Sequence, residues 1–390
     1  MTKLEQLIQE LCPNGVAFKK LREIATISRG GNLQKKDFSS EGVPCIHYGQ
    51  IYTQYGLFAN KTFTFISDEC AKRQKMAVQN DIIMAVTSEN IEDVCKCVAW
   101  LGNEPVAVSG HTAIIHHNQN ARYLTYLFSS TLFQKQKRKF THGTKVIEVT
   151  PDKLNDIVIP IPPLPVQNEI VRILDNFAEL TAELTAELTA RKKQYEYYRD
   201  KLLLQNNMIE YKTLPDISTN YDKKRKPITK EKRDIGIYPY YGASGVVDYV
   251  ADYIFEGEYL LISEDGANLL ARNTPIAFSI SGKNWVNNHA HVIQFDNAEM
   301  RKYVEFYLNS IDLGQYISGG AQPKLNQFNL NKIPIPIPYK NNIKQIVNIL
   351  IKFDALCNDL TSGLPAEITA RQKQYEYYRD KLLTFREKVV

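Results

Sequence analysis

Apolar side chains recur at helical spacing through residues 166–204, a stretch that contains neither proline nor glycine. Steps of three or four residues, apart from a gap of seven around Arg191, connect Ile170, Ile173, Leu174, Phe177, Leu180, Leu184, Leu188, Tyr195, Tyr198 and Leu202. This spacing predicts one amphipathic helix with a length of roughly 60 Å at 1.5 Å per residue. Its apolar stripe is narrow enough for the seam of a coiled coil.

The helical stretch is partly duplicated later in the chain. Residues 186–203 and 366–383 are related by an offset of 180 and differ only at Leu188/Ile368 and Lys192/Gln372. The preceding segment, residues 154–177, resembles residues 330–353 at an offset of 176, so the second copy carries four more residues before its helical repeat. A tandem duplication of a unit of about 180 residues, which is an ordinary domain size, explains both offsets.

Each half shows the same order of predicted elements, which is a strand-rich region, a proline-rich segment and a long helix. β-branched and aromatic runs between Gly, Asn and Pro predict strands at residues 81–86, 105–108, 257–263 and 275–280. Matching short helices are predicted at residues 122–128 and 301–308.

Two proline-rich segments, residues 159–165 and 333–338, follow the strand-rich regions. Alternating prolines exclude a helix or a central strand, so these segments are predicted to be extended, stiff connectors. Gly363 and Pro365 interrupt the second helical copy and predict a kink or break there.

The predicted fold class is α+β, with two mixed α/β domains joined by two long helices. Two apolar stripes in one chain are buried most simply against each other, as a coiled coil. The internal duplication favours an antiparallel pair with pseudo-two-fold symmetry. The predicted parts are a first globular domain at 1–158, a connector and first helix at 159–207, a second globular domain at 208–334, and a connector and second helix at 335–390.

A tetrapeptide repeat, Ala-Glu-Leu-Thr, fills residues 178–190 of the first helix. Four residues turn about 400° on an α-helix, so each repeat shifts the leucine stripe by about 40°. One added unit would lengthen the helix by about 6 Å without interrupting it. This pattern fits a ruler of defined length and also a plain coiled-coil spacer.

Composition narrows the class of protein. The chain has 390 residues, 44% hydrophobic and 23% charged, as in a soluble globular protein long enough for two cores. No apolar run approaches the ~18 residues of a membrane span, and the N-terminus lacks the apolar core of a signal peptide. Six dispersed cysteines predict neither a disulfide framework nor a zinc site. We therefore expect a cytoplasmic protein without membrane contact, and the net charge of +5 permits nucleic-acid binding.

Catalytic motifs are missing from both halves. Gly282-Lys283 lacks the upstream glycine and the following hydroxyl of a phosphate-binding loop, and residues 242–245 do not form a nucleophile elbow. Lone histidines are more often hydrogen-bonding residues than catalysts. We therefore expect no catalytic residue and no metal site in this chain.

The duplicated segments at 193–203 and 373–383, the tetrapeptide repeat, and the Ile-Pro-Ile-Pro connector before residues 167–174 together resemble the DNA-specificity subunits of type I restriction–modification systems. The resemblance implies that two target-recognition domains each read one half of a bipartite sequence in double-stranded DNA, and that a coiled coil sets the gap. It also implies that the helices dock two modification (methyltransferase) subunits, and that a restriction subunit joins the full complex. S-adenosylmethionine, ATP and Mg²⁺ would belong to those partners, and this chain would hold no cofactor. The four-residue difference between the copies departs from strict symmetry and leaves the spacer length open.

Basic loops provide the candidates for contact with DNA phosphates, because lysine and arginine neutralise phosphate oxygens regardless of base sequence. The candidates are Arg29, Lys35, Lys36, Lys137, Arg138, Lys139, Thr144 and Lys145 in the first domain and Lys224, Arg225 and Lys226 in the second. A run of charges is also typical of a solvated loop. DNA is favoured because the globular parts show no other binding chemistry.

Loops that occur at matching places in both halves provide the candidates for base contact. These candidates are Tyr48, Gln50, Ser88, Asn90 and His111 in the first domain and Tyr241, Ser244, Asn268, Asn288, His289, Gln322 and Lys324 in the second. Such side chains can pair with base edges in a groove. Turns stabilised by Asn, Asp and Gly have the same composition, and no base is assigned to any residue.

The helical repeat is the second candidate site, because Tyr and Arg are common anchors of protein interfaces. Candidates for partner contact are Arg191, Lys192, Tyr197 and Arg199 in the first copy and Arg371, Tyr377 and Arg379 in the second. A solubilising rim on a coiled coil would look similar. Two other functions stay open: a self-sufficient enzyme on DNA with an unrecognised motif, and a scaffold without a DNA role.

Overall fold

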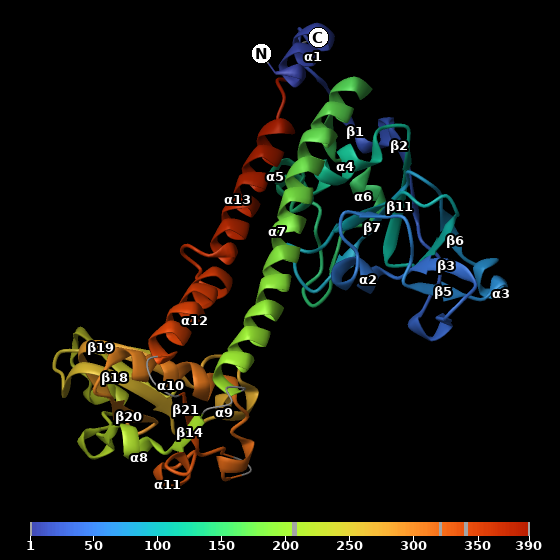
Figure 1. Ribbon diagram of the computed structural model, residues 1–390. Coiled ribbons are helices and arrows are strands. Elements are labelled where there is room, and N and C mark those ends of the chain that lie inside the picture. The colour runs from blue at the N-terminus through green and yellow to red at the C-terminus, as the bar shows by residue number, and fades with distance from the viewer. Residues whose placement is uncertain (1, 205–208, 320–321, 339–341, 389–390) are drawn as a thin grey trace. The chain divides into compact units, whose positions relative to one another are not determined.

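The chain forms two compact units that share the long helices. The computed structural model describes residues 2–204, 209–319, 322–338 and 342–388 (Figure 1). The first unit comprises residues 1–183 and 368–390, and the second comprises residues 184–367. Each unit therefore contains one globular domain and parts of both helical segments. The predicted boundary between residues 207 and 208 lies outside the described residues.

Helix α7 (Leu164–Leu204) is the predicted first long helix, and its 41 residues form one uninterrupted element. Val166, Ile170 and Leu174 are buried in the first unit, where the apolar stripe packs on the globular domain. In the repeat region the stripe is less covered, and Leu180 keeps 49% of its surface exposed. The drift of a four-residue repeat around the helix accounts for this exposure.

The second helical copy is broken as the sequence predicts. Helix α12 (Asn342–Asn358) ends before the Gly363 position, and α13 (Leu364–Leu382) begins directly after it. In the second unit, Tyr195 and Tyr198 of α7 stack on Phe353 of α12, with ring centroids 6.2 and 6.0 Å apart. Lys192 precedes Tyr195 in α7, and Cys357 follows Phe353 in α12. The positive charge of Lys192 is close enough to favour the thiolate of Cys357. The two segments therefore run antiparallel.

A five-stranded sheet is the centre of the first globular domain, with the order β2-β11-β7-β9-β4. Neighbours are antiparallel except β4 and β9, which are parallel. The strands are β2 (Ala25–Arg29), β11 (Thr112–His117), β7 (Ile82–Ala85), β9 (Cys97–Trp100) and β4 (Phe58–Ala59). All side chains of β7 and β9 are buried, which explains their continuous apolar sequence.

A four-stranded sheet packs beside it, with the order β5-β3-β10-β6. Its strands are β5 (Thr64–Ile66), β3 (Val43–Ile46), β10 (Val106–Val108) and β6 (Lys75–Ala77), and β8 (Thr87–Ser88) pairs with β12 (Ile147–Glu148). The helices of the domain are α1 (Lys3–Leu11), α2 (Tyr48–Thr53), α3 (Asp68–Ala71), α4 (Ala121–Phe128), α5 (Thr131–Lys137) and α6 (Pro151–Leu154). Predicted strands and the predicted short helix at 122–128 thus correspond to β7, β10 and α4.

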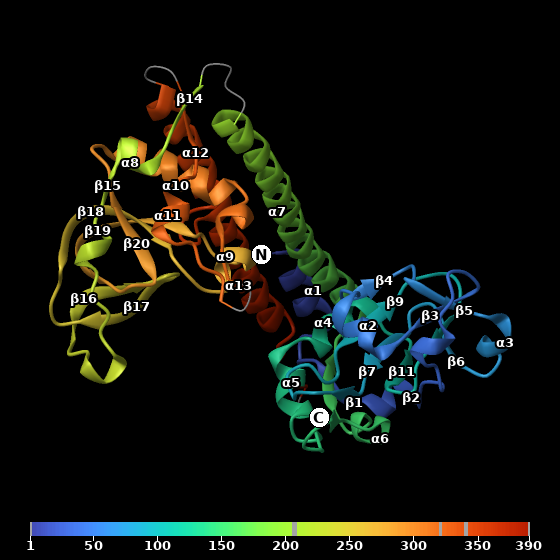
Figure 2. The same ribbon diagram turned by 90° about the horizontal axis from the view of Figure 1, so that it is seen from below.

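The second globular domain contains one six-stranded sheet with the order β15-β20-β18-β19-β16-β17 (Figure 2). Its strands are β15 (Thr219–Asn220), β20 (Ala290–Gln294), β18 (Phe255–Ser263), β19 (Ala277–Val286), β16 (Ile235–Gly242) and β17 (Gly245–Val250). The helices are α8 (Leu214–Ile217), α9 (Asn268–Ala271), α10 (Ala298–Ser310) and α11 (Gln327–Leu330). Strand β18 and the start of β19 are the strands predicted at 257–263 and 275–280, and α10 contains the predicted helix at 301–308.

Both proline-rich connectors contain an extended strand, and each strand pairs with one from the start of its domain. The predicted extent of the first connector to residue 165 is wrong, because Leu164 and Pro165 form the start of α7, where a proline needs no N–H donor. Strand β13 (Val158–Ile161) is antiparallel to β1 (Ala17–Lys20), and β21 (Ile335–Pro338) is antiparallel to β14 (Ile209–Lys212). Each pair is a separate two-stranded sheet, where a missing proline N–H is tolerated. The pairing closes each globular domain at the base of its helix.

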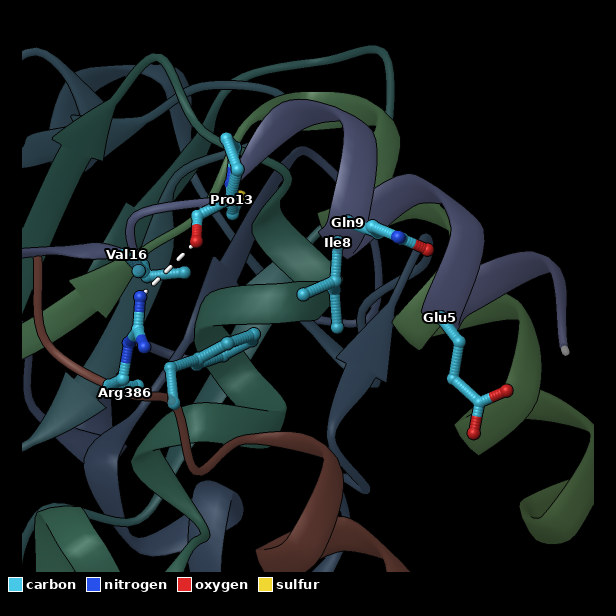
Figure 3. A pocket seen from close by; sticks show the side chains of 9 residues that line it. Glu5, Ile8, Gln9, Pro13, Val16 and Arg386 are labelled. Atoms are coloured by element: carbon cyan, nitrogen blue, oxygen red, sulfur yellow. Dashed lines mark hydrogen bonds between the residues drawn. The ribbon is translucent and has the colours of Figure 1, made fainter.

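The segment after α1, residues 13–16, lies beside residues 385–388 in the first unit. The Val16 amide donates to the Arg386 carbonyl at 2.9 Å, and Arg386 Nη2 donates to the Pro13 carbonyl at 3.2 Å (Figure 3). A pocket of about 400 Å³ lies here, between α1 and the C-terminal segment, with Ile8 and Phe385 in its apolar lining. The C-terminal segment thereby completes the first unit.

Candidate nucleic-acid interface

The two globular domains share a strand framework that ends at matching loops. Strand β7 pairs with β11 through Met84 and Ala113, and β18 pairs with β20 through Ile262 and His291. Each residue of the second-domain pair lies 178 positions after its counterpart in the first-domain pair. Directly beyond them, the Val86 amide donates to the His111 carbonyl and the Glu264 amide donates to the His289 carbonyl, each at 2.9 Å. Sequence positions that are far apart therefore reach the same end of each sheet.

A short hairpin joins this end in both domains. In the first domain, His142 and Glu148 exchange two backbone hydrogen bonds of 3.0 and 2.9 Å. In the second domain, Ser318 and Lys324 exchange two bonds of 2.9 and 2.7 Å. Gly320 and Ala321, which belong to the loop predicted from the sequence, lie outside the described residues.

The residue after each hairpin ties it to the sheet. The Val149 amide donates to the Val86 carbonyl at 3.0 Å, and the Leu325 amide donates to the Glu264 carbonyl at 2.7 Å. We call this end of each domain its loop end. It comprises residues 29–31, 47–50, 86–90, 109–111 and 142–149 in the first domain and residues 225–226, 241–245, 263–268, 287–289, 318–319 and 322–326 in the second.

A further pair of loops meets at each loop end. The Tyr48 amide donates to Ser109 Oγ at 2.9 Å, and the Asn287 amide donates to the Tyr241 carbonyl at 3.0 Å. The Gly31 amide donates to the Val108 carbonyl at 2.8 Å, and the Lys226 amide donates to the Val286 carbonyl at 3.3 Å. The matching loops that the sequence singled out are thus brought together within each domain.

Aromatic and basic side chains surround the loop end of the first domain. The rings of Tyr48 and His111 lie 4.9 Å apart. Arg29 Nε donates to the Gly110 carbonyl at 2.8 Å, and its Nη2 lies 3.4 Å from Glu148 Oε1. Burial lowers the pKa of His47, and the charges of Lys35 and His111 lower it further. A neutral His47 ring accepts the Gly49 amide at 3.2 Å, which fixes the start of α2.

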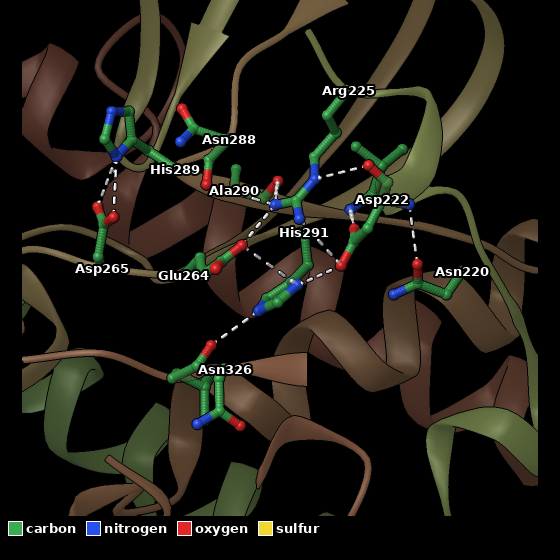
Figure 4. A network of polar contacts seen from close by, with 12 residues as sticks. Asn220, Asp222, Arg225, Glu264, Asp265, Asn288, His289, Ala290, His291 and Asn326 are labelled. Atoms are coloured by element: carbon green, nitrogen blue, oxygen red, sulfur yellow. Dashed lines mark hydrogen bonds and ion pairs between the residues drawn. The ribbon is translucent and has the colours of Figure 1, made fainter. Parts of the chain in front are cut away.

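Polar side chains with exposed ends surround the loop end of the second domain. Asn288 and His289 are exposed, and His289 Nδ1 lies 2.9 Å from Asp265 Oδ2 (Figure 4). Lys324 Nζ lies 3.2 Å from Glu264 Oε1, and about half of the Lys324 side chain remains exposed. Ser244 is exposed at the tip of the β16–β17 hairpin, and Tyr241 is half-buried beside it.

Other candidates of the first domain differ in their accessibility. Lys35, Lys36, Lys139, Thr144 and Lys145 are exposed. Arg138 is exposed and paired with Glu92 at 3.2 Å, and Asn90 bonds to Asp93 through both side-chain atoms. Ser88 is half-buried in the short strand β8.

Two first-domain candidates are buried. Lys137 has 1% of its surface exposed, and its Nζ donates to the carbonyls of Glu92 and Val94 at 2.8 and 2.5 Å. Gln50 is also buried, and its Oε1 accepts the His47 amide. Both side chains hold the domain together and do not face a ligand.

Candidates of the second domain are divided in the same way. Lys224, Lys226 and Gln322 are exposed, and Lys224 Nζ lies 4.9 Å from the ring centre of Tyr221. Asn268 closes its own loop by two hydrogen bonds with the backbone of Thr274. Arg225 exposes only 14% of its side chain, because its guanidinium faces Asp222 and Glu264. The sequence of the basic run did not indicate that the guanidinium of Arg225 is buried.

Glu148 and Glu264 at the loop ends, and Asp222 close to one of them, are charged residues outside the predicted candidates. Glu148 accepts Arg29 in the first domain, and Asp222 and Glu264 flank Arg225 in the second. Glu148 and Glu264 are 119 and 39 residues from these partners, so local patterns did not reveal them, whereas Asp222 is three residues from Arg225. The duplication offset of 176 aligns Glu148 with the predicted candidate Lys324. This alignment is the sequence feature that could have identified Glu148.

Asp222, Glu264 and His291 place one ligand atom each within 4.8 Å of one another, which is a geometry that can hold a metal ion. Arg225 Nη1 lies 2.5 Å from Glu264 Oε2, and Lys324 Nζ neutralises the other oxygen of the same carboxylate. The space and the charge of a cation are therefore already supplied by side chains. The group is a set of ion pairs and does not fit a metal centre.

The duplicated helical segment repeats its contacts in both copies. Lys201 lies 5.9 Å above the Tyr197 ring, and Lys381 lies 5.9 Å above the Tyr377 ring. Tyr197 and Tyr377 expose 61% and 62% of their surface. The other contacts repeat as well, namely Arg191 with Gln194, Arg371 with Gln374, Arg199 with Asp200 and Arg379 with Asp380. Lys192 is exposed. Two units thus present the same aromatic and basic surface.

Helices that could cross a membrane are not found in the part of the chain that the structure describes. Within that part all six cysteines are buried as free thiols.

Comparison with known proteins relates both halves of the chain to one family. The type I restriction modification DNA specificity domain matches residues 13–191 and again residues 206–370. A specificity subunit from Haemophilus influenzae is 40% identical over 189 residues, which are 47% of this chain and 49% of the relative. The EcoR124I/EcoR124II specificity subunit of Escherichia coli is 38% identical over 255 residues, covering 59% of this chain and 63% of the relative. The EcoprrI specificity subunit of Escherichia coli is 31% identical over 345 residues, 84% of each chain.

Solved structures share the fold at low sequence identity. The S subunit of a type I restriction-modification system from M. genitalium has a TM-score of 0.57 and 14% identity, covering 94% of this chain and 96% of its own. A chain from a type I R-M system studied for complex assembly and conformational transition has a TM-score of 0.64 and 13% identity, covering 95% and 98%. Two mixed α/β domains with a long helix between them are therefore a known arrangement.

Proposed function

This chain belongs to the family of type I restriction modification DNA specificity domains, and on that premise we propose that it reads a bipartite sequence in double-stranded DNA. Each globular domain reads one half of the target through its loop end. The long helices set the gap between the halves. The matches span about half to two thirds of the length of the first two relatives, so activity and partners are part of the proposal.

One observation carries the proposal, namely that the two domains keep the same loop-end framework and change the side chains on it. The hairpin position occupied by Glu148 in the first domain is occupied by Lys324 in the second. A carboxylate accepts from the amino group of cytosine, whereas an ammonium donates to guanine acceptors. A shared framework with exchanged donors and acceptors is what two readers of different sequences need.

Phosphate contact is assigned to the exposed cations that lie around the loop ends. In this proposal Lys35, Lys36, Arg138, Lys139 and Lys145 serve the first domain, and Lys224 and Lys226 serve the second. Base contact is assigned to Arg29, Tyr48, Ser88, Asn90, His111 and Thr144 in the first domain and to Tyr241, Ser244, Asn288, His289, Gln322 and Lys324 in the second. Lys137, Gln50, Arg225 and Asn268 are left out, because their polar atoms are engaged inside the domains.

The repeated helical surface is the proposed docking site for modification (methyltransferase) subunits. Two copies of one surface, each centred on an exposed tyrosine under a lysine, suit two copies of one partner. S-adenosylmethionine, ATP and Mg²⁺ are proposed to reside on those subunits and on a restriction subunit. This chain acts as a non-catalytic specificity subunit of a cytoplasmic complex.

Among the histidines with a carboxylate partner, the buried His291 does not favour the alternative of an autonomous enzyme. His291 is fully buried, and its Nδ1 and Nε2 lie 2.6 and 2.8 Å from protein oxygens. Neither nitrogen is placed to take a proton from a bound substrate. The ring therefore has a structural environment.

Co-expression with a neighbouring modification subunit, followed by methylation-sensitive sequencing of host DNA, tests the proposal. A two-part methylated motif with a fixed gap of unspecified bases is expected. A continuous motif, or no motif despite a stable complex, would favour the scaffold function. DNA methylation or cleavage by the purified chain alone would favour the enzyme.

A further inference from the structure

The second domain contains a buried cluster of charged and polar side chains, two of which correspond to apolar residues in the first domain. We call Asp222, Arg225, Glu264 and His291 the charged quartet (Figure 4). Strand register matches His291 with Ala113, and the equivalent backbone hydrogen bond matches Glu264 with Val86. Ala113 and Val86 are fully buried. His291 and Glu264 are therefore polar replacements in the framework that both domains share.

His291 lies at the centre of the quartet, with an acceptor beside each ring nitrogen. Nδ1 is 2.6 Å from Asp222 Oδ2 and 3.8 Å from Glu264 Oε2, and Nε2 is 2.8 Å from the Leu325 carbonyl oxygen. Both short contacts are with oxygen acceptors, so each ring nitrogen is placed as a donor. Arg225 faces the two carboxylates in a site where no quartet side chain is more than 14% exposed.

The carboxylates are held in their ionised form. Burial raises the pKa of Asp222, but hydrogen bonds from His291 and Val292 and the charges of His291 and Arg225 outweigh it, and the pKa lies below its ordinary value. Burial also raises the pKa of Glu264, and the hydrogen bonds from Arg225 and Lys324 with the charges of His291 and Arg225 lower it overall. Two ionised carboxylates therefore lie against the Arg225 guanidinium.

Three loop-end segments of the second domain, residues 263–268, 287–289 and 322–326, contain or touch quartet residues directly. Arg225 Nη1 donates to the carbonyl of Ala290 at 2.8 Å, next to the exposed Asn288 and His289. Glu264 Oε1 accepts Lys324 at 3.2 Å. The Leu325 carbonyl, which His291 holds, follows Lys324 directly in the chain. The side chains proposed for base contact are thus the exposed ends of segments that the quartet ties together.

We infer that the charged quartet is the positioning device for base reading by the second domain. This inference rests on the proposed function. A buried charge network requires its partners at fixed distances, since any displaced group leaves a desolvated charge unpaired. Apolar packing, as at Val86 and Ala113, imposes no such distances. The quartet residues act through Asn288, His289 and Lys324 and are positioning residues without DNA contact.

Base discrimination, measured separately at each half of the target, distinguishes a loss of positioning in the second domain from a general loss of stability. The complex of this chain with its modification subunit is assayed for methylation of duplexes that carry one changed base in either half-site. Asp222→Asn keeps the acceptor for the Val292 amide but removes the charge. We expect it to lower discrimination at the second half-site about tenfold. This loss is within the range of affinity changes that a single mismatched base pair causes. Discrimination at the first half-site is expected to stay unchanged. Loss of folded complex would lower all rates together and cancel in these ratios.

A second variant covers the case in which Asp222→Asn fails to assemble. Glu264→Val with His291→Leu removes two polar members of the quartet together and leaves the oppositely charged pair of Asp222 and Arg225, which is the better tolerated kind of change. This double variant is also expected to lower base discrimination at the second half-site only. The matched control is Glu258→Gln in the same strand β18, whose carboxylate is 59% exposed and pairs with Arg301 at 2.8 Å. This control is expected to leave both ratios unchanged.

Two results would overturn the inference. One is unchanged base discrimination at the second half-site in a variant that assembles. The other is an equal loss of base discrimination at both half-sites. A wild-type complex without a two-part motif would instead contradict the proposed function, so the two failures are distinguishable.

Discussion

The ring of Phe177 in α7 stacks on the ring of Tyr378 in α13, with centroids 5.4 Å apart and an angle of 20° between the planes. This pair lies in the first unit, and the stacks of Tyr195 and Tyr198 on Phe353 play the same part in the second. Both contacts flank the repeat region, where Leu180 is half exposed. Aromatic pairs at separate places therefore join the helical segments within each unit.

Phe177→Leu removes the stack and keeps an apolar side chain of similar reach. We expect the free energy of unfolding of the first unit to fall by about 1 kcal/mol, the contribution of an aromatic pair beyond its buried area. Urea unfolding followed by circular dichroism measures the change. Tyr377→Leu, one residue from Tyr378 but exposed, is the control and should leave stability unchanged. Equal effects of both substitutions would contradict a specific role for the stack.

Insertion of one Thr-Ala-Glu-Leu unit after Leu188 tests the ruler. The helix would grow by about 6 Å, close to two base-pair steps of about 3.4 Å. We expect methylation sequencing to show a longer gap and the same two half-sites. A single inserted alanine rotates the following helix by about 100° and should impair assembly, because it moves the apolar stripe. Altered half-site bases after the four-residue insertion would show that the helix does not measure the gap.

Local pattern was sufficient for the long helices, for α4 and α10, and for the places of the loops. The uninterrupted course of α7 from Val166 follows from 3.6-residue periodicity without Pro or Gly, and the break before α13 follows from Gly363 and Pro365. The duplication offset led to Lys324, which the hairpin of the second domain does place at the loop end. These features depend on residues close in sequence or on comparison of the two halves.

Burial of charge could not be predicted in the same way. Lys137 stands in a run of basic residues, yet it is the member that turns inward, towards the Glu92 and Val94 carbonyls. Asp222 reaches His291, which lies 69 residues further along the chain. Such contacts depend on the tertiary fold, and a charge run on its own is equally typical of a solvated loop.

Lys137 and Lys139 therefore should respond differently to the same substitution. Lys137→Ala leaves two buried carbonyls without a donor, and we expect a loss of about 3 kcal/mol in the free energy of unfolding. Lys139→Ala, on the exposed side, should leave stability unchanged and weaken binding of DNA with a reduced salt dependence. Thermal unfolding and filter binding at two salt concentrations measure both effects. A stable Lys137→Ala protein with weakened DNA binding would reverse the assignment.

Tyr197 and Tyr377 should contribute one partner-docking site each. We expect Tyr197→Ala or Tyr377→Ala to weaken binding of one modification subunit by about 2 kcal/mol, as for an interface anchor, and the double variant to weaken both. Analytical ultracentrifugation of titrated subunits reports the stoichiometry. Tyr211→Ala, at a tyrosine in β14 with 64% of its surface exposed, is the matched control. Undiminished binding of two subunits by the double variant would place the docking site elsewhere.

Acid should act on the second unit through the carboxylates of the charged quartet. The pKa values of Asp222 and Glu264 lie below their ordinary values of 3.8 and 4.5 in the folded chain, so the unfolded chain binds protons first as pH falls. Stability from these ion pairs is therefore complete above about pH 4.5 and is lost as pH falls through the lowered values. Asp222→Ala breaks the network at every pH, and we expect it to cost about 3–5 kcal/mol at neutral pH. The difference between variant and wild type should shrink as pH falls, and urea unfolding from pH 7 to pH 3 measures it. A constant difference over that range would mean that the ionised carboxylate is not what stabilises this unit.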